Sequence, residues 1–390
     1  MDNRSSISNS DRGGALPVEA DSFAAWRGVP QAGIIALLAL ALIDLSLGSG
    51  SFPWSEVVPR VKPVQSVYWG VARDRAELGR LDSAPASARR VVVMGSSRGH
   101  TGFREEMAAA AMPDVVFAKL SHALQDPVTI HALTPEVIAA GIDVLVLPMS
   151  HMDTHRPIRL EPLPAKSTSR MATMLDLIEA TGVDFAVENR EPMYRVALAG
   201  VSNLYRFRDS LGRSGINAAR EFALDARLEG KRGVLLRGPP VLGKPSPARL
   251  RPELEEGLLS PLPERQRSWV YQLAWFVEAR KGLHADIQMN LLREIVRDVR
   301  EAGASVLIVE CPVHPIGKIL EGQGAEVEFH QLARELANDR GVWFHPLSAS
   351  PRYWLEDFDD LFHLNEVGGT RFTQTILELL PAALSSEASN

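Results

Sequence analysis

The sequence predicts an α/β protein. We expect a three-layer α/β/α sandwich with a mostly parallel five-stranded sheet, a helical insertion and an N-terminal transmembrane helix. Three observations predict this fold. Five short apolar runs alternate with helical segments, which is typical of parallel strands that are buried on both faces. The stretch 156–283 interrupts this alternation, and one almost wholly apolar run lies near the N-terminus.

The N-terminal segment has the pattern of a membrane anchor. Residues 1–30 are rich in Ser, Gly, Asp and Arg, so we expect a disordered cytoplasmic tail. Residues 31–48 are almost wholly apolar and approach the length of a transmembrane helix, with Asp44 near one end. Arg27 precedes this run, and no Lys or Arg follows it before Arg60. This asymmetry favours a cytoplasmic N-terminus and an exported main domain.

Two other interpretations of the apolar run stay open. A cleavable signal peptide would use a small-residue site, for which Gly48-Ser49-Gly50 is a faint candidate. A buried core helix of this length would more often show polar periodicity. Residues 49–87 are expected to form a linker followed by a first helix over 67–81.

The main domain is expected over 88–383, followed by a disordered tail at 384–390. Runs of β-branched residues and leucine predict the strands, at 90–94, 115–119, 143–147, 305–310 and 342–345. Apolar periodicity and composition predict the helices, at 103–112, a helix closing at 135–140, and then 284–302, 329–340 and 369–380. Gly303 and Gly341 end the two helices that precede them.

The insertion at about 156–283 is expected to be mostly helical, with a Pro/Gly-rich loop at 238–247. Arginines are frequent from Tyr194 to Lys231, with Tyr205 and Phe207 among them. This stretch is either a docking surface for an anionic polymer, headgroups or a membrane partner, or a solvated helical face that covers the sheet.

Polar residues that can do chemistry follow the ends of four predicted strands. Ser97, the loop 150–153, His314, and the loop with Asp360 and His363 all come after a strand. Ligands of parallel sheets bind beyond the carboxyl ends of the strands. We therefore expect these residues to gather at one edge of the sheet.

The strongest chemical pattern is a serine with a distant histidine and carboxylate. Gly95 permits a tight turn after the first strand, so Ser97 can begin a helix as a nucleophile. Ser96 is the alternative nucleophile, and both serines could instead only cap a helix. His363 is the expected base, and Asp360, three residues earlier, can orient its ring.

Gly95-Ser96-Ser97 together with Asp360-x-x-His363 resembles the SGNH (GDSL-like) hydrolase superfamily, over residues 88–155 and 284–383. It most resembles the membrane-anchored branch that includes the teichoic-acid D-alanylation and alginate O-acetylation proteins. The resemblance implies an SGNH/flavodoxin-like fold. It also favours Ser97 over Ser96 as the nucleophile, since the superfamily usually has aspartate at the position of Ser96. The spacing of the superfamily motif favours Asp360 over Asp357 or Asp359 as the carboxylate.

The resemblance further implies an acyltransferase or esterase that acts on O-acyl groups, such as acetyl, of an exported or cell-envelope polysaccharide. It implies a membrane-bound O-acyltransferase as partner, and a place in the bacterial inner membrane with the catalytic domain periplasmic or extracellular. The alternatives are a stand-alone periplasmic carbohydrate esterase or lipase, and a non-catalytic scaffold that binds glycan or an assembly partner.

The expected oxyanion hole departs from the superfamily pattern. The second loop has no glycine and the third has no Gly-x-Asn-Asp. The backbone of Ser121 and the hydroxyl of Ser150, with the N–H of Ser97, are the remaining candidates for donors. Such a weakened hole fits slow, partner-dependent acyl transfer, and it also fits an inactive enzyme. Arg98 and His314 are candidate substrate contacts, although Arg98 could instead pair with Glu105 or Glu106.

Other functions are not expected. The net charge of −6 gives no reason to expect a nucleic-acid partner. The single cysteine, Cys311, excludes an intramolecular disulfide. His151-x-Asp153-x-His155 would place three metal ligands on one face of an extended loop, but we interpret it as a polar loop and expect neither metal nor cofactor. The stretch 238–244 lacks the spacing of a phosphate-binding loop.

Overall fold

The computed structural model describes residues 34–46, 67–121, 125–155, 158, 171–202, 205, 284–314, 324–347, 353–360 and 362–385. The chain divides into two units, 1–52 and 53–390. The predicted tail 1–30, the linker up to residue 66 and the Pro/Gly-rich loop 238–247 lie outside the described residues, as does most of the arginine-rich stretch.

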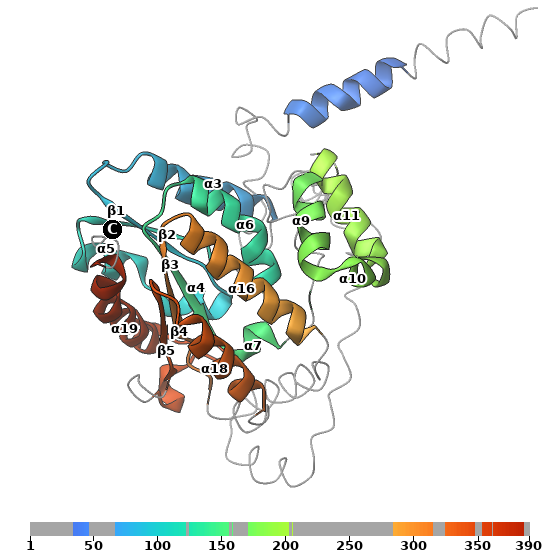
Figure 1. Ribbon diagram of the computed structural model, residues 1–390. Coiled ribbons are helices and arrows are strands. Elements are labelled where there is room, and N and C mark those ends of the chain that lie inside the picture. The colour runs from blue at the N-terminus through green and yellow to red at the C-terminus, as the bar shows by residue number, and fades with distance from the viewer. Residues whose placement is uncertain are drawn as a thin grey trace, which may run out of the picture. The chain divides into compact units, whose positions relative to one another are not determined.

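Five parallel strands form the sheet of the second unit (Figure 1). They are β1 (Arg89–Val93), β2 (Val115–Lys119), β3 (Val144–Met149), β4 (Ser305–Glu310) and β5 (Val342–His345). The strand order is β2-β1-β3-β4-β5, and every neighbouring pair is parallel. The order reverses between β1 and β3, which is the switch point where α/β sheets open a crevice for ligands.

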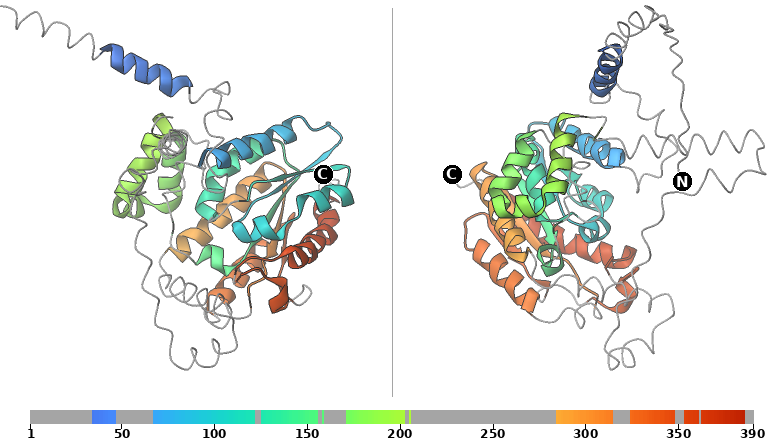
Figure 2. Two further views of the ribbon diagram at one scale, coloured as in Figure 1. Left: turned by 180° about the vertical axis from the view of Figure 1, so that it is seen from behind. Right: turned by 90° about the vertical axis from the view of Figure 1, so that its right-hand side faces the viewer.

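Helices connect the strands and lie on both sides of the sheet, as the two views of Figure 2 show. They are α3 (Val67–Asp82), α4 (Ser97–Gly102), α5 (Glu105–Ala111), α6 (Pro127–Ala139), α7 (His151–Thr154), α9 (Met171–Thr181), α10 (Val183–Glu188), α11 (Arg190–Val201), α16 (Ala285–Glu301), α18 (Gly324–Leu336) and α19 (Glu366–Ser385), with a 3-10 turn η5 (Leu355–Asp357). The predicted α/β class with a parallel five-stranded sheet is confirmed.

Alternation of side chains along each strand produces two cores. In β1, Val92 packs with α3, α6, α16 and α18, whereas Val91 and Val93 pack with α5 and α19. Side chains on successive strand residues point to opposite faces, so a buried run such as Val91-Val92-Val93 needs an apolar layer on each side. The sheet is therefore the middle of three layers.

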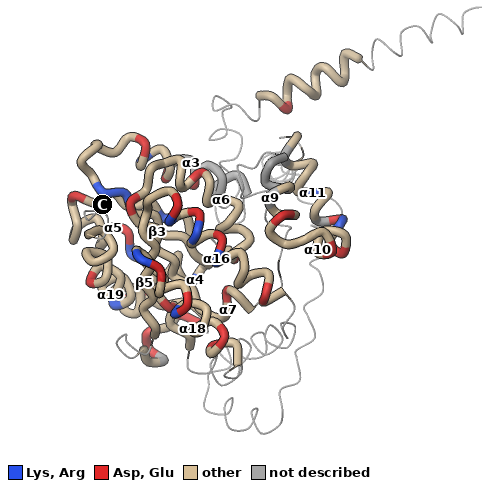
Figure 3. Tube along the Cα trace, in the orientation of Figure 1, with Lys and Arg blue, Asp and Glu red and all other residues tan. Residues whose placement is uncertain are grey.

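Helix α16 shows how sequence periodicity fits this arrangement. Its apolar stripe is fully buried, at Leu291, Leu292, Ile295, Val296 and Val299. The outer side carries both signs of charge, with Arg297 against Asp298 at 3.0 Å (Figure 3). Gly303 follows with φ of 90°, a left-handed conformation that ends the helix and that side chains disfavour.

Several predicted helix boundaries were wrong. The helix expected over 103–112 is α5, which begins two residues later and ends one residue earlier, and Phe103 and Arg104 separate it from α4, which begins at Ser97 as expected. The prediction for α18 was 329–340, whereas the helix begins five residues earlier and ends at Leu336. The tail predicted from residue 384 overlaps α19, which continues to Ser385. Helix ends are set by caps and contacts that periodicity alone does not contain.

The described part of the insertion is helical, as predicted. Helices α9, α10 and α11 form a third apolar cluster with Val128 of α6 and Leu291 of α16. From the first unit, the structure describes a helix over 34–46 within the predicted anchor 31–48. Among the described helices, none combines the length and the apolar character that a membrane crossing requires.

Candidate active site

Ser97 lies at the first residue of α4, directly beyond the end of β1. Gly95 precedes it at the point where the chain passes β3. A Cβ on Gly95 would lie 2.6 Å from the backbone oxygen of Pro148, closer than real Cβ contacts. Gly95 is not among the glycines with positive φ in the described residues. The glycine was expected to permit a tight turn, but the structure requires it for close approach to β3.

A small hairpin carries the other two residues of the triad. Phe358 and Leu364 form an antiparallel bridge, and both side chains are buried in the core beside α19. The backbone N–H of Asp359 donates to the carbonyl of His363 at 2.9 Å. Asn365 braces the end of the hairpin: its side-chain oxygen accepts from the N–H of Gly368 at 3.0 Å, and its side-chain amide donates to the carbonyl of Glu356. Two buried anchors therefore hold a partly exposed loop.

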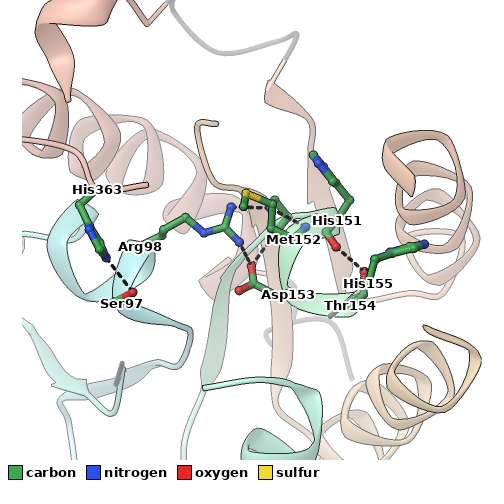
Figure 4. A network of polar contacts seen from close by, with 9 residues as sticks. Ser97, Arg98, His151, Met152, Asp153, Thr154, His155 and His363 are labelled. Carbon is green, nitrogen blue, oxygen red and sulfur yellow. Dashed lines mark hydrogen bonds and ion pairs between the residues drawn. The ribbon is translucent and has the colours of Figure 1, made fainter. Parts of the chain in front are cut away.

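Ser97, His363 and Asp360 form one hydrogen-bonded chain. Nε2 of His363 lies 2.8 Å from Oγ of Ser97, and Nδ1 lies 2.7 Å from Oδ2 of Asp360. Figure 4 shows the imidazole pointing at the serine hydroxyl. With the Nδ1 proton on the Asp360 side, Nε2 accepts from the serine, which is the tautomer needed for a base. Ser97 and His363 are 266 residues apart in the sequence.

The carboxylate of Asp360 is held in its charged form. Burial raises its pKa, but hydrogen bonds from the His363 ring and from the N–H of Phe362, with the attraction of His363, outweigh burial and lower the pKa. Oδ1 accepts from the backbone N–H of Phe362 at 2.7 Å and of His363 at 2.8 Å. An anionic Asp360 can stabilise the imidazolium that forms when His363 takes a proton.

The neighbouring candidates take other positions. Ser96 occupies the N-cap position of α4 and makes no capping hydrogen bond; its hydroxyl is buried, and no hydrogen-bond partner for it is found among the described residues. Asp357 is buried and accepts from the N–H of Trp354 at 2.8 Å and from Arg371 at 2.8 Å. Asp359 is exposed. Of these serines and aspartates, Ser97 and Asp360 have side chains hydrogen-bonded to the His363 ring.

Two of the candidate oxyanion donors, Ser121 and Ser150, lie just beyond the ends of β2 and β3, the two neighbours of β1. The hydroxyl of Ser121 is buried and donates to the carbonyl of Val93 at 3.2 Å. The hydroxyl of Ser150 accepts from the N–H of Met152 at 3.1 Å and from Arg98 at 2.7 Å. A hydroxyl that accepts two hydrogen bonds keeps its own proton for donation. The oxyanion roles of Ser97, Ser121 and Ser150 stay predictions.

Arg98 forms a buried ion pair that joins the β1 and β3 loops. Its guanidinium lies 2.5 Å from Oδ2 of Asp153, and the two side chains are 6% and 2% exposed (Figure 4). The sequence suggested Glu105 or Glu106 as the partner, but Glu105 lies against Arg80. Breaking one side of such a pair leaves a buried charge uncompensated. A contact between Arg98 and substrate stays a prediction.

His314 follows β4 and lies close to the triad loop. It is 6% exposed, and its ring packs edge-on against Phe358 with centroids 5.1 Å apart. Burial lowers the pKa of His314 to about 4, although attraction to Asp360 opposes this shift. A neutral imidazole therefore borders the site at neutral pH. Its role in substrate binding stays a prediction.

The triplet His151, Asp153 and His155 does not lie along an extended segment. His151 and Asp153 lie in the short helix α7, and His155 is its C-cap residue. The helix start is a capping box, in which the side chains of Ser150 and Asp153 each accept from a backbone N–H of the other end of the box. The three side chains point in different directions in Figure 4. Nε2 of His155 lies 2.9 Å from Glu328 of α18. The idea of a shared face, which motivated a metal interpretation, was wrong because the backbone is helical.

The sequence-based prediction missed two features of the site, the helix α7 and the ion pair between Arg98 and Asp153. Ser150-x-x-Asp153 is the capping-box pattern, which would have predicted a helix start at this position. The pairing of Arg98 with Asp153 had no such local signal, because 55 residues separate them. No known family matches the chain in a comparison with family models, and no curated protein matches it.

Proposed function

We propose that the protein is a serine acyltransferase or esterase that carries an acyl group on Ser97. The observation that supports this proposal is the chain of contacts from Ser97 to His363 at 2.8 Å and from His363 to Asp360 at 2.7 Å. A serine hydroxyl needs a positioned base, and the base needs an orienting group. The parallel sheet and the motif spacing support an SGNH-like domain of the flavodoxin-like kind.

The reaction has two halves. Oγ of Ser97 attacks the carbonyl carbon of the acyl donor while Nε2 of His363 takes the serine proton, and the collapse of the tetrahedral intermediate returns that proton to the leaving oxygen. An acceptor hydroxyl, or water, then attacks the acyl-serine, again with His363 as base. Asp360 stays anionic throughout and stabilises the imidazolium.

Three groups are proposed to bind the oxyanion: the N–H of Ser97, the N–H of Ser121 and the hydroxyl of Ser150. The charged Arg98 donor at 2.7 Å makes Ser150 a better donor than an isolated hydroxyl, because donation to the oxygen polarises its O–H bond. This hole still lacks the asparagine amide of the superfamily. Losing one strong donor can cost about 10²–10³ in rate.

We propose that an exported or envelope polysaccharide accepts the acyl group from Ser97 or donates it to Ser97. In the transfer direction, a membrane-bound O-acyltransferase would supply the acyl group. Residues 31–48 would anchor the protein in the membrane. The motif resemblance and the apolar helix over 34–46, in which Leu37 and Leu42 are 67% and 68% exposed, support this part. A weak oxyanion hole suits transfer to a held acceptor, since positioning can supply several kcal/mol of the barrier.

Labelling with a serine-directed fluorophosphonate tests the nucleophile. Full-length purified protein should be labelled on Ser97, as located by mass mapping, and Ser97→Ala should abolish the label. The adjacent Ser96→Ala is the matched control and should keep the label. His363→Ala should slow labelling by about 10³-fold or more because the serine loses its base. Equal labelling of Ser97→Ala would show that the assignment is wrong.

The acyl content of an exported polysaccharide separates the possible functions. In cells that lack the gene or carry Ser97→Ala, a transferase predicts a lower acyl content. A higher acyl content would identify a deacylating esterase, as would activity of the purified protein on simple acetyl esters without a partner. Full complementation of the deletion by Ser97→Ala would identify a non-catalytic scaffold.

A further inference from the structure

A second cluster of polar side chains lies on β4 and α18 and shares no residue with the proposed triad. Glu310 is the last residue of β4, Glu326 lies in the first turn of α18, and His330 lies one turn further along that helix. One ligand atom from each of the three residues lies within 4.8 Å of the other two. The two helical residues are four positions apart, so they share one face of α18.

Glu310 has the environment of a buried metal ligand. It is 1% exposed. Its Oε2 accepts from the backbone N–H of Leu347 at 2.5 Å and faces Nε2 of His330 at 2.9 Å. Its other oxygen, Oε1, is buried, and no hydrogen-bond partner for it is found among the described residues. A buried carboxylate oxygen without a partner is costly, and a bound cation removes that cost.

We propose that Glu310, Glu326 and His330 bind a divalent transition-metal ion of the Zn²⁺ type. The ion would replace the proton between His330 and Glu310 and would bind Oε1 of Glu310, the oxygen for which no partner is found among the described residues. The present 2.9 Å between Nε2 of His330 and Oε2 of Glu310 is a hydrogen-bond separation, and it would widen on metal binding. Ligands of tetrahedral zinc lie at about 2.0–2.2 Å from the metal, and thus roughly 3.5 Å apart. Glu326, which is partly exposed, moves inward to complete the set.

The mixed donor set decides the class of ion. Imidazole with carboxylates suits Zn²⁺ and its transition-metal neighbours, whereas Ca²⁺ and Mg²⁺ favour oxygen donors alone. Water would fill the fourth position. The N–H of Leu347 orients the Glu310 carboxylate as an outer-shell contact. Since the ligands come from a strand end and a helix, binding would tie α18 to the edge of the sheet.

Zinc binding by the chelator-stripped, full-length protein tests the site. Equilibrium dialysis with Zn²⁺ alone should show one saturable site, and Zn²⁺ should raise Tm. His330→Ala and Glu326→Gln should each weaken binding by at least ten-fold and reduce the Tm shift. Because Glu326 is partly exposed and lies in the first helical turn, Glu326→Gln keeps the test valid even where His330→Ala does not fold.

Glu328→Gln is the matched control. It removes another Glu–His contact of α18, the one to His155 at 2.9 Å. Among the described residues, this pair is not part of a group of three metal-ligating side chains. The variant's affinity for Zn²⁺ should stay within two-fold of the wild type. Absence of saturable binding, or the same loss in Glu328→Gln as in Glu326→Gln, overturns the proposal. Equal affinity for Ca²⁺ overturns the assignment to a transition metal. Ser97 labelling is independent of these outcomes.

Discussion

The charge states of single residues determine what the site can do. Asp360 and His314 interact, and both have lowered pKa values, but the result is a charged group at Asp360 and a neutral group at His314. Hydrogen bonds from the loop overcome burial at Asp360 and keep it anionic, while burial dominates at His314 and keeps it neutral. The anionic Asp360 can therefore stabilise a protonated His363, and the neutral His314 borders the site without adding charge.

The buried His314 predicts a loss of stability in mild acid. Its pKa is about 4 in the folded protein, against 6.5 for a solvated histidine, so between these values the unfolded chain binds the proton and the folded chain does not. The free energy of unfolding then falls as pH drops below 6.5, and about 2 kcal/mol is lost by pH 5 from this residue. His314→Gln should remove that part of the pH dependence, as measured by urea unfolding at pH 7.5 and pH 5.

Asp360 contributes little to the stability change between pH 7.5 and pH 5. Its pKa is lowered in the folded protein, so the stability that it adds is lost only as pH falls below the pKa of an ordinary aspartate. An unchanged pH dependence in His314→Gln would show that His314 is not the buried titrating group.

At the scale of elements, the hairpin 358–364 is positioned by the start of α19. Gly368 makes this contact possible. A Cβ at this position would lie 2.3 Å from the backbone oxygen of Asp357 and 2.8 Å from Cδ2 of Leu364. The backbone of α19 at Gly368 therefore lies too close to the hairpin for any side chain at this position. The packing of α19 thus determines the position of the hairpin that carries His363.

Gly368→Ala should disturb both stability and the triad. Because the clash includes a backbone oxygen, the loop must move, and overpacking of this kind costs about 1–3 kcal/mol. We expect a lower urea midpoint and a slower rate of fluorophosphonate labelling at Ser97. Gly79→Ala in α3 is the control, since among the described residues no atom outside its own helical turn lies within 4 Å of the added Cβ. That variant should be neutral or slightly more stable. Normal labelling in Gly368→Ala would contradict this role for α19.

At the scale of the whole molecule, strand order brings distant segments together. β1 ends beside β3 at the switch point of the sheet, so Ser97 and the Arg98–Asp153 pair belong to the same edge. The hairpin with Asp360 and His363 follows β5 in the chain, and its buried residues Phe358 and Leu364 share an apolar cluster with Val91 and Val93 of β1. The site is thus a product of topology rather than of any one segment.

The proposed anchor predicts the orientation of the full-length protein in the membrane. The flanking charge around 31–48 favours a cytoplasmic N-terminus, so the main domain should be exported. A reporter that works only outside the cytoplasm, fused after Asn390, should be active. The same fusion without residues 1–48 is the control and should be inactive. An inactive full-length fusion would contradict the orientation, and a mature protein cut near Gly48 would identify a signal peptide.

The sequence by itself determined the features that depend on a few neighbouring residues. Strands β2, β4 and β5 match their predicted ranges, because β-branched runs and the glycines that punctuate them are local signals. Asp360 and His363 are close in space because they are three residues apart in one turn. The proposed nucleophile was chosen from its place after a strand, with the motif resemblance deciding between two adjacent serines.

Only the tertiary structure decided the contacts that cross the chain. The 2.8 Å approach of Ser97 and His363, the burial of Arg98 against Asp153 and the need for Gly95 beside Pro148 all depend on which strands are neighbours. The predicted start of α18 at residue 329 left Glu326 outside the helix, so its place one turn before His330 on the same helix was not visible. Helix ends and crossovers are decided by long-range packing, and that packing is not contained in local periodicity.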